Sequence, residues 1–194
     1  MIMELKGEVM ERLTNEEFIR FCMDNSELRI ERNAEGEILI NMPTYSKTGE
    51  INSEVNYQLV SWNKKHKLGK TFDSSTGFDL PSSAMRSPDA SWVSAERWNS
   101  LNEEEKGQFA QICPDFVIEI KSETDFLPQL KEKMLKDWIG NGCRLGWLIV
   151  PESETVFIYR EDGTIGKVVG FDNKLSGEDV LQNFELELSE LRIN

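Results

Sequence analysis

The sequence predicts an α/β (α+β) fold, in which a mixed central sheet contains one βαβ unit and is flanked by helices. The first observation is a pair of short apolar runs, over residues 113–122 and 145–150, which are typical of buried strands. The second is helical spacing between them, beginning at Pro128 and ending near Gly140. The third is a hairpin pattern on each side of this unit. Two strands joined by such a helix should be parallel, with a right-handed crossover.

Length and composition fit a single domain over residues 1–194. The chain is 39% hydrophobic and 29% charged, and its size allows a sizeable core. An uninterrupted apolar span is missing from the sequence, so no membrane partner is expected. The first eight residues include acids and lack the apolar core of a secretory signal, and three cysteines are widely spaced. We therefore expect a reduced, cytoplasmic location.

The formal net charge is −13, from 22 Lys and Arg against 35 Asp and Glu. Proteins that bind nucleic acid without specificity gain affinity by neutralising phosphates, so this balance argues against a general binder of that class. Lysines cluster over residues 64–70 and 131–136, and solvated helix surfaces explain each cluster most simply. A local cationic face is compatible with the sequence.

The N-terminal part predicts a helix and then a hairpin. Thr14 can cap a helix that runs to about Met23, because Glu17 three residues later completes a capping box. Strand-like residues 28–31 and 38–40 flank a turn. We expect this part to form a layer on the main sheet without chemistry of its own.

A second helix is expected from residue 48 or 52 to about 65. Its apolar stripe recurs at steps of four, four and three residues: Ile51, Val55, Leu59 and Trp62. Glu54 lies on the flank of this stripe. It is either an ordinary surface carboxylate, which is the usual preference of Glu, or a carboxylate at the rim of the interior.

Short strand-like pieces follow at residues 71–73, 77–80 and 86–93. Pro88 removes one ladder hydrogen bond, so it suits an edge, a bulge or a strand start. Asp89 follows it, and a Ser-Pro-Asp turn would equally explain both residues. Asn102 precedes three glutamates and predicts a short acidic surface helix.

The strand over residues 113–122 carries charges in an apolar setting. Because strand side chains alternate, Glu119 and Lys121 should share one face, opposite Ile118 and Ile120. A carboxylate buried there needs a cation, a metal ion or water.

The C-terminal part predicts a hairpin and a tail. Residues 155–159 and 167–169 should pair around an Asp162-Gly163 turn. The leucines of residues 181–191 should close the core.

Several mechanisms lack the residues they require. His66 is the only histidine and lies among lysines, which excludes a histidine triad and a Cys/His zinc site. Glycine-rich nucleotide loops are also missing. Carboxylate chemistry with Mg²⁺ or Mn²⁺ remains, in which Asp89, Glu119 and the Ile120 carbonyl supply oxygen ligands. Lys121 could then orient the attacking water or help to deprotonate it.

The motif Ser87-Pro88-Asp89, followed thirty residues later by Glu119-Ile120-Lys121, resembles the PD-(D/E)XK nuclease signature. More of the chain is similar to the Uma-two family of bacterial proteins assigned as restriction endonucleases, from about Thr14 to Leu191. The segments that carry this resemblance are residues 52–56, 86–89, 114–119, Ser122, Lys133-Met134 and 146–151.

The resemblance implies a restriction-endonuclease-like core over residues 12–192 and Mg²⁺-dependent hydrolysis of phosphodiester bonds in DNA, with Mn²⁺ as a substitute. It implies a catalytic set of Asp89, Glu119 and Lys121, and a further metal carboxylate at Glu54. It also implies substrate contacts: Gln129 and Lys133.

The sequence departs from the family in three places. Many members have a hydrophobic residue where Lys121 stands, Trp138 replaces a frequent Tyr, and a frequent His before the first core helix has no counterpart. Two alternatives to a DNA endonuclease therefore stay open: a non-catalytic binding or assembly protein, and a phosphate-ester hydrolase whose substrate is not duplex DNA. Cleavage of both DNA strands by one site per chain would favour a symmetric homodimer.

Overall fold

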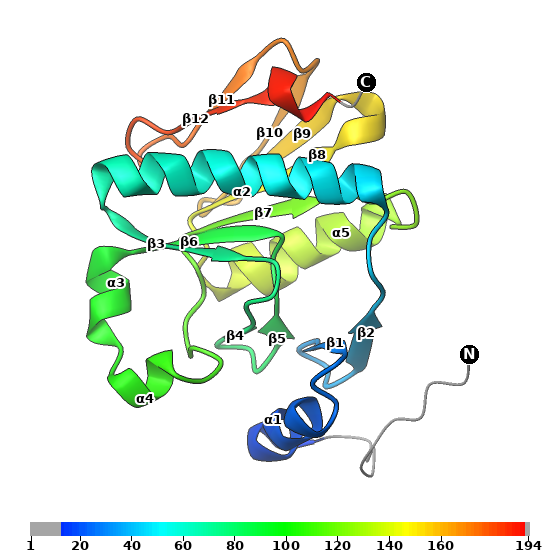
Figure 1. The fold of residues 1–194 in the computed structure, drawn as a ribbon, viewed down its shortest axis with the longest axis vertical. Coiled ribbons are helices and arrows are strands. Elements are labelled where there is room, and N and C mark those ends of the chain that lie inside the picture. The colour runs from blue at the N-terminus through cyan, green and yellow to red at the C-terminus, as the bar shows by residue number, and fades with distance from the viewer. Residues whose placement is uncertain (1–12, 193–194) are drawn as a thin grey trace.

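A computed structural model describes residues 13–192 (Figure 1). The expected domain limits at residues 1, 12 and 194 and the acidic first eight residues lie outside this range. Within it, a six-stranded sheet has the order β10-β9-β8-β7-β6-β3. Its strands are β3 (Gly69–Asp73), β6 (Ala90–Ser94), β7 (Phe116–Ile120), β8 (Leu145–Val150), β9 (Thr155–Arg160) and β10 (Ile165–Val169).

Strand β7 lies inside this sheet and has a neighbour on each side. It runs parallel to β8 and antiparallel to β6, and the other neighbouring strands are antiparallel pairs. The β7 and β8 strands are joined through α5 (Leu127–Lys133). The predicted mixed sheet with one βαβ unit is therefore confirmed.

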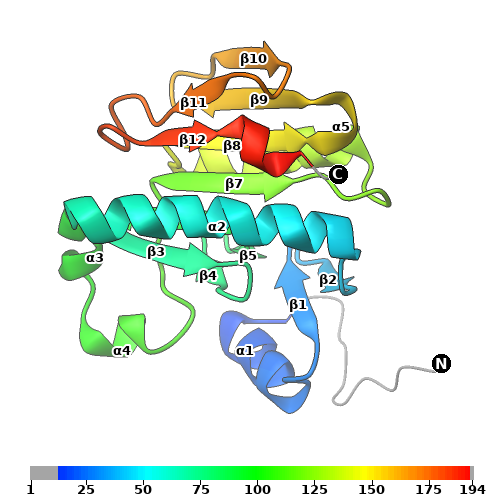
Figure 2. The ribbon, with the colours of Figure 1, turned by 45° about the horizontal axis from the view of Figure 1, so that its top comes forward.

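Helices cover both faces of the sheet. The long helix α2 (Ser46–His66) covers one face, and the predicted stripe of four apolar residues is buried there. On the same side, the tail adds β11 (Lys174–Ser176), β12 (Glu185–Glu187) and a 3-10 turn (Leu188–Leu191), whose leucines close that core as expected. Helix α5 covers the other face (Figures 1 and 2).

The side chains of β7 alternate between these two cores. Phe116, Ile118 and Ile120 pack in the core beneath α2. Val117 packs in the opposite core, and Glu119 contacts Trp138 on that side. The expected alternation is confirmed from Phe116 to Ile120, where β7 ends, one residue before Lys121.

The N-terminal part forms α1 (Asn15–Asp24) and a hairpin of β1 (Arg29–Arg32) and β2 (Ile38–Asn41). Thr14 and Glu17 form the predicted capping box. The hairpin extends into a second, four-stranded sheet of order β2-β1-β5-β4, with β4 (Phe78–Asp79) and β5 (Met85–Arg86). It therefore attaches beside the main sheet, at the end of the molecule opposite β10 (Figure 1).

One expected element is divided in the structure. The strand expected over residues 86–93 is split into β5 and β6, with Pro88 between them. The short acidic helix predicted after Asn102 is present as α4 (Glu103–Lys106), which Asn102 caps, and a separate helix α3 (Ala95–Ser100) precedes it.

The helix that starts at Leu127 also changes character along its length. It is α-helical only to Lys133, then continues as a π-helical turn (Met134–Trp138) and a 3-10 turn (Ile139–Asn141). The π turn leaves Asp137 and Trp138 both buried. Such turns recur at functional sites.

The described residues contain no helix that is long and apolar enough to cross a membrane.

Candidate active site

Asp89 and Glu119 are brought together by the pairing of β6 and β7. Ala90 lies opposite Ile118 in this antiparallel pair, so the next facing pair would be Pro88 and Ile120. Proline has no N–H, and the ladder stops there. The Ile120 N–H instead donates to Oδ2 of Asp89 at 2.7 Å. The Ile120 carbonyl consequently receives no ladder hydrogen bond from Pro88.

Two asparagines of α2 fix Asp89 from the other side. Asn52 Nδ2 donates to Oδ1 of Asp89 at 3.0 Å, and Asn56 Nδ2 donates to its main-chain carbonyl at 3.1 Å. Both oxygens of the carboxylate thus accept a hydrogen bond. The side chain is held in a single orientation by a helix and a strand.

Glu119 is 5% exposed and its partners come from the helix behind it. Lys133 Nζ lies 2.8 Å from Oε1, and Trp138 Nε1 donates to the same oxygen at 2.8 Å. The π turn places Trp138 in this position. The cation that pairs with the buried carboxylate is therefore Lys133.

A buried ion-pair network continues from Lys133 to the N-terminal hairpin. Lys133 Nζ lies 3.8 Å from Oε2 of Glu31, and Arg86 Nη1 lies 3.0 Å from the same oxygen. Arg86 Nε also donates to Asp137 at 2.7 Å. The Ser87 N–H donates to Glu31 at 3.2 Å. Alternating charges thus connect β1, β5 and the π turn to the candidate site.

Burial and mutual repulsion control the protonation of the acids. Burial first, and then the charge of Glu119, raise the pKa of Asp89 to about 7, against the opposing effect of the Ile120 hydrogen bond. Burial also raises the pKa of Glu119, although Lys133 opposes it. Burial disfavours the Lys133 ammonium, but Glu119 and Glu31 outweigh it and raise its pKa. Lys133 is therefore a cation at neutral pH.

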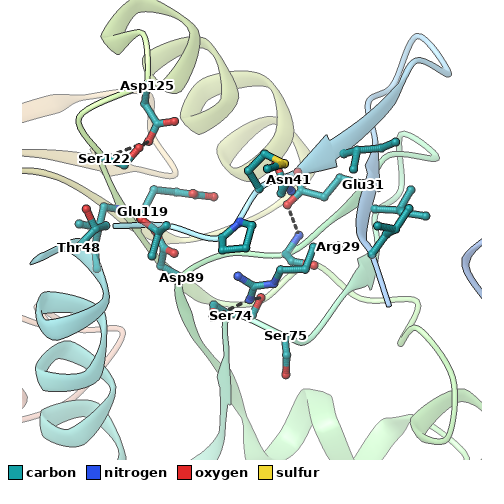
Figure 3. A pocket seen from close by; sticks show the side chains of 18 of the residues that line it. Arg29, Glu31, Asn41, Thr48, Ser74, Ser75, Asp89, Glu119, Ser122 and Asp125 are labelled. Atoms are coloured by element: carbon teal, nitrogen blue, oxygen red, sulfur yellow. Dashed lines mark hydrogen bonds between the residues drawn. The ribbon is translucent and has the colours of Figure 1, made fainter. Parts of the chain in front are cut away.

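A pocket of about 1090 Å³ opens onto these residues (Figure 3). Asp89, Glu119, Ile120 and Lys133 line it, together with residues of β1, β2 and the segment that leads into α2. The close-up shows the Asp89 and Glu119 side chains next to each other in this pocket. The carboxylates are thus accessible to a ligand despite their burial.

The donor set fits a hard divalent cation such as Mg²⁺. The described residues contain no group of three or more His, Cys, Asp or Glu side chains that could hold a metal ion. Mg²⁺ usually takes one or two carboxylates and fills its other positions with water and substrate phosphate. Asp89, Glu119 and the unpaired side of the Ile120 carbonyl match this set, and two acids with raised pKa values would gain from a cation between them.

The structure does not bring Lys121 to Glu119, as the sequence suggested. Lys121 Nζ lies 2.7 Å from Glu152 and donates to the Ser122 carbonyl at 3.0 Å. Its side chain is not part of the pocket lining. Lys121 was expected on the same strand face as Glu119, but it pairs with Glu152 and the cation beside Glu119 is Lys133.

Glu54 and Gln129 also lie outside the pocket lining. Glu54 accepts a hydrogen bond from Gln58 at 3.0 Å, on the flank of α2 opposite Asn52. The expected metal role for Glu54 therefore has no support in this geometry, because residues two apart on a helix point in nearly opposite directions. Gln129 is exposed on α5, whereas Lys133 one turn later is a lining residue.

Sequence reasoning missed several residues around the site. The N-terminal hairpin was expected to form a layer without chemistry of its own, but Glu31 and Arg29 both line the pocket. The spacing of Asn52 and Asn56, one turn apart beside the apolar stripe, could have identified their shared flank. Glu31 and Arg86 are 55 residues apart, and no local pattern connects them.

Comparison with known proteins identifies a matching family model and a solved structure with a similar fold. A family model described as "Uma2: Putative restriction endonuclease" matches residues 15–189. The crystal structure of a "putative nuclease belonging to DUF820" from Anabaena variabilis superposes with a TM-score of 0.71 and 25% identity, covering 85% of this chain and 90% of that chain.

A DrdV–DNA complex solved by cryo-electron microscopy reaches a TM-score of 0.36 at 10% identity, over 63% of this chain and 12% of that one. This similarity is too low to support an argument about function. No curated protein matches the chain.

Proposed function

This chain belongs to the Uma2 family, and on that premise we propose that it is a metal-dependent nuclease that hydrolyses phosphodiester bonds in DNA. The observation that carries the proposal is the convergence of Asp89, Glu119 and Lys133 in one pocket. Two carboxylates from adjacent strands and one cation are a suitable set for phosphoryl transfer.

Asp89, Glu119 and the Ile120 carbonyl would hold Mg²⁺, with Mn²⁺ as a substitute. The bound ion would polarise the phosphoryl oxygen and lower the pKa of a water molecule. Asn52 and the Ile120 N–H keep the Asp89 carboxylate oriented toward that position. Trp138 does the same for Glu119.

Lys133 supplies positive charge for the phosphate in this proposal. Its raised pKa keeps it protonated, so it stabilises developing negative charge rather than accepting a proton from water. Lys121, which the sequence motif suggests, is the competing candidate for this role. Its pairing with Glu152 favours Lys133.

A divalent-metal nuclease assay over a panel of DNA and RNA substrates tests the proposal. Asp89→Asn and Glu119→Gln should each abolish detectable cleavage. Lys133→Met should lower the rate by about 10²- to 10³-fold, as removal of one charge-stabilising donor does elsewhere. Lys121→Met is the matched control and should retain most activity.

Two outcomes would contradict the proposal. Metal binding without cleavage of any polynucleotide would favour a hydrolase of other phosphate esters. A protein that binds no Mg²⁺ or Mn²⁺ at millimolar concentration would favour a non-catalytic binding or assembly role.

Light scattering in the presence and absence of DNA would show whether two chains combine into the symmetric homodimer that double-strand cleavage favours.

A further inference from the structure

The N-terminal hairpin forms a fixed wall of the candidate active site. Strands β1 and β2 and the segment leading into α2 line the pocket. Glu31 is buried against Arg86, and Arg32 donates to the carbonyls of Leu13 at 3.0 Å and Ser83 at 2.9 Å. Because these contacts are internal and the two arginines are buried, the wall is anchored to the rest of the fold rather than a free flap.

This wall limits what can reach the buried acid. Glu119 is 5% exposed, so a phosphodiester must enter the pocket to approach it. The volume of about 1090 Å³ is slightly larger than the upper end, about 1,000 Å³, for pockets that enclose one ligand. A single strand can insert its backbone alone, whereas each phosphodiester of a duplex is accompanied by the paired strand.

The charges that line the pocket also disfavour a duplex. Among the described residues, the lining has two cationic side chains, Arg29 and Lys133, beside four carboxylates. Duplex DNA carries about one charge per 1.7 Å, and its binding proteins neutralise many of them. With a net charge of −13 and few cations in the pocket, the chain is better suited to the lower charge density of a single strand.

Arg29 is the exposed one of these two cations, and it lies beside Ser74 in the pocket (Figure 3). Its Nη2 donates to the Ser74 carbonyl and, at 2.8 Å, to Ser74 Oγ. A guanidinium has five N–H donors in a fixed fork, so the other donors can bind a phosphate oxygen. Ser74 thus holds Arg29 at the pocket without occupying the whole side chain.

Large exposed side chains surround the same pocket. Tyr45 is 57% exposed, Met42 is 75% exposed and Met23 is 72% exposed, and all three are lining residues. Unpaired bases stack on aromatic rings, which contributes about 1–3 kcal/mol per base. Bases inside a duplex are already stacked and cannot use such a surface.

We propose that the substrate of this site is single-stranded nucleic acid, with a phosphate on Arg29 and a base stacked on Tyr45. The inference rests on the proposed nuclease function, because it assigns the substrate class of the same site. Phosphate and base are common to DNA and RNA, and separate arms of the test distinguish the two.

The test measures binding apart from cleavage. Full-length Glu119→Gln protein is titrated with Mg²⁺ present against one labelled oligonucleotide sequence as single-stranded DNA, as single-stranded RNA and as duplex DNA, and anisotropy gives each Kd. The same titrations are repeated with wild-type protein in EDTA, which prevents cleavage, in case the Glu119→Gln variant does not fold. At least one single strand should bind about tenfold more tightly than the duplex.

Two substitutions assign the contacts in the same background. Arg29→Ala and Tyr45→Ala should each weaken single-strand binding by about tenfold, the loss expected for one charged hydrogen bond or one stacked base. Arg20→Ala and Tyr57→Ala are matched controls, because both residues are exposed but outside this pocket lining. They should change the Kd by less than twofold.

The outcomes separate this inference from the nuclease proposal. Equal or tighter binding of duplex, no binding of any single strand, or equal losses in the control variants would each overturn the inference. If wild-type protein with Mg²⁺ then cuts duplex DNA but no single strand, the nuclease proposal stands and the single-strand inference fails. If single strands bind through Arg29 and Tyr45 but no polynucleotide is cut, the inference stands and the nuclease proposal fails.

Discussion

At the scale of single residues, one proline explains the local geometry of the candidate site. Pro88 has no N–H to donate to the Ile120 carbonyl, the β6–β7 ladder ends before it, and the Ile120 N–H donates to Asp89 Oδ2. A motif that reads as a turn in the sequence therefore holds the Asp89 carboxylate against the main-chain N–H of Ile120.

Protonation of Asp89 should control metal binding. Its pKa is raised to about 7, and a carboxylate must lose its proton to bind a cation, so Mg²⁺ affinity should increase as the pH rises through 7. A fixed Mg²⁺ concentration should therefore raise the Tm more at pH 8 than at pH 6. Thermal melts measure this difference.

Asp89→Asn serves as the control for this experiment. In this variant, Mg²⁺ should raise the Tm by a small amount that is the same at both pH values. An unchanged shift in wild-type protein between pH 6 and pH 8 would mean that Asp89 is not the group whose deprotonation limits binding.

At the scale of elements, the site depends on the attachment of the N-terminal hairpin to the π turn. Arg86 on β5 joins Glu31 on β1 to Asp137 in that turn. All three side chains are buried, so each charge depends on its partners. The hairpin thus contributes to the position of Lys133 as well as to the pocket wall.

Arg86→Met should destabilise the protein strongly. It leaves Glu31 and Asp137 buried without their shared cation, and breaking such a pair costs about 3–5 kcal/mol. Arg144→Met is the control, because Arg144 pairs with Asp179 at the surface and should lose about 1 kcal/mol or less. Urea unfolding of both variants measures the difference, and similar losses would show that the buried network is not important for stability.

Sequence patterns predicted the elements better than their contacts. The capping box of Thr14, the apolar stripe of α2 and the alternation along β7 depend on neighbours in sequence, and each is confirmed. The partner of Glu119 depends on where α5 packs. Two lysines were available, Lys121 directly after β7 and Lys133 at the end of α5, and only packing distinguishes them.

At the scale of the whole molecule, a surface ion pair between Arg192 and Glu154 connects the C-terminal tail to the loop between β8 and β9. Glu154 follows β8 and accepts from Arg192 through both oxygens at 2.8 Å, and it also accepts from the Phe171 N–H at 2.9 Å. The Arg192 and Phe171 hydrogen bonds lower the pKa of Glu154 to about 2. The tail residues that cover the core beneath α2 are therefore stabilised in place by the solvent-exposed ion pair of Arg192 and Glu154.

Glu154→Gln should lower the Tm at pH 7 by a small amount. A carboxyl with a lowered pKa stabilises the fold above its unfolded pKa, so the contribution should disappear as the pH falls from about 4.5 toward 2. Melting wild-type and variant protein across this range tests the sign. The two curves should converge at the acid end, and a difference in Tm that persists there would contradict this role of Glu154.

The network around Arg86 also has a consequence for how the protein is made. Arg86 bonds to residues 55 positions before it and 51 positions after it, so these contacts have high contact order. On the ribosome, Glu31 is synthesised long before Arg86, and Asp137 long after it. A nascent chain that ends before Asp137 cannot assemble the complete site. Any hydrolytic activity of this protein would thus be acquired only late in its synthesis.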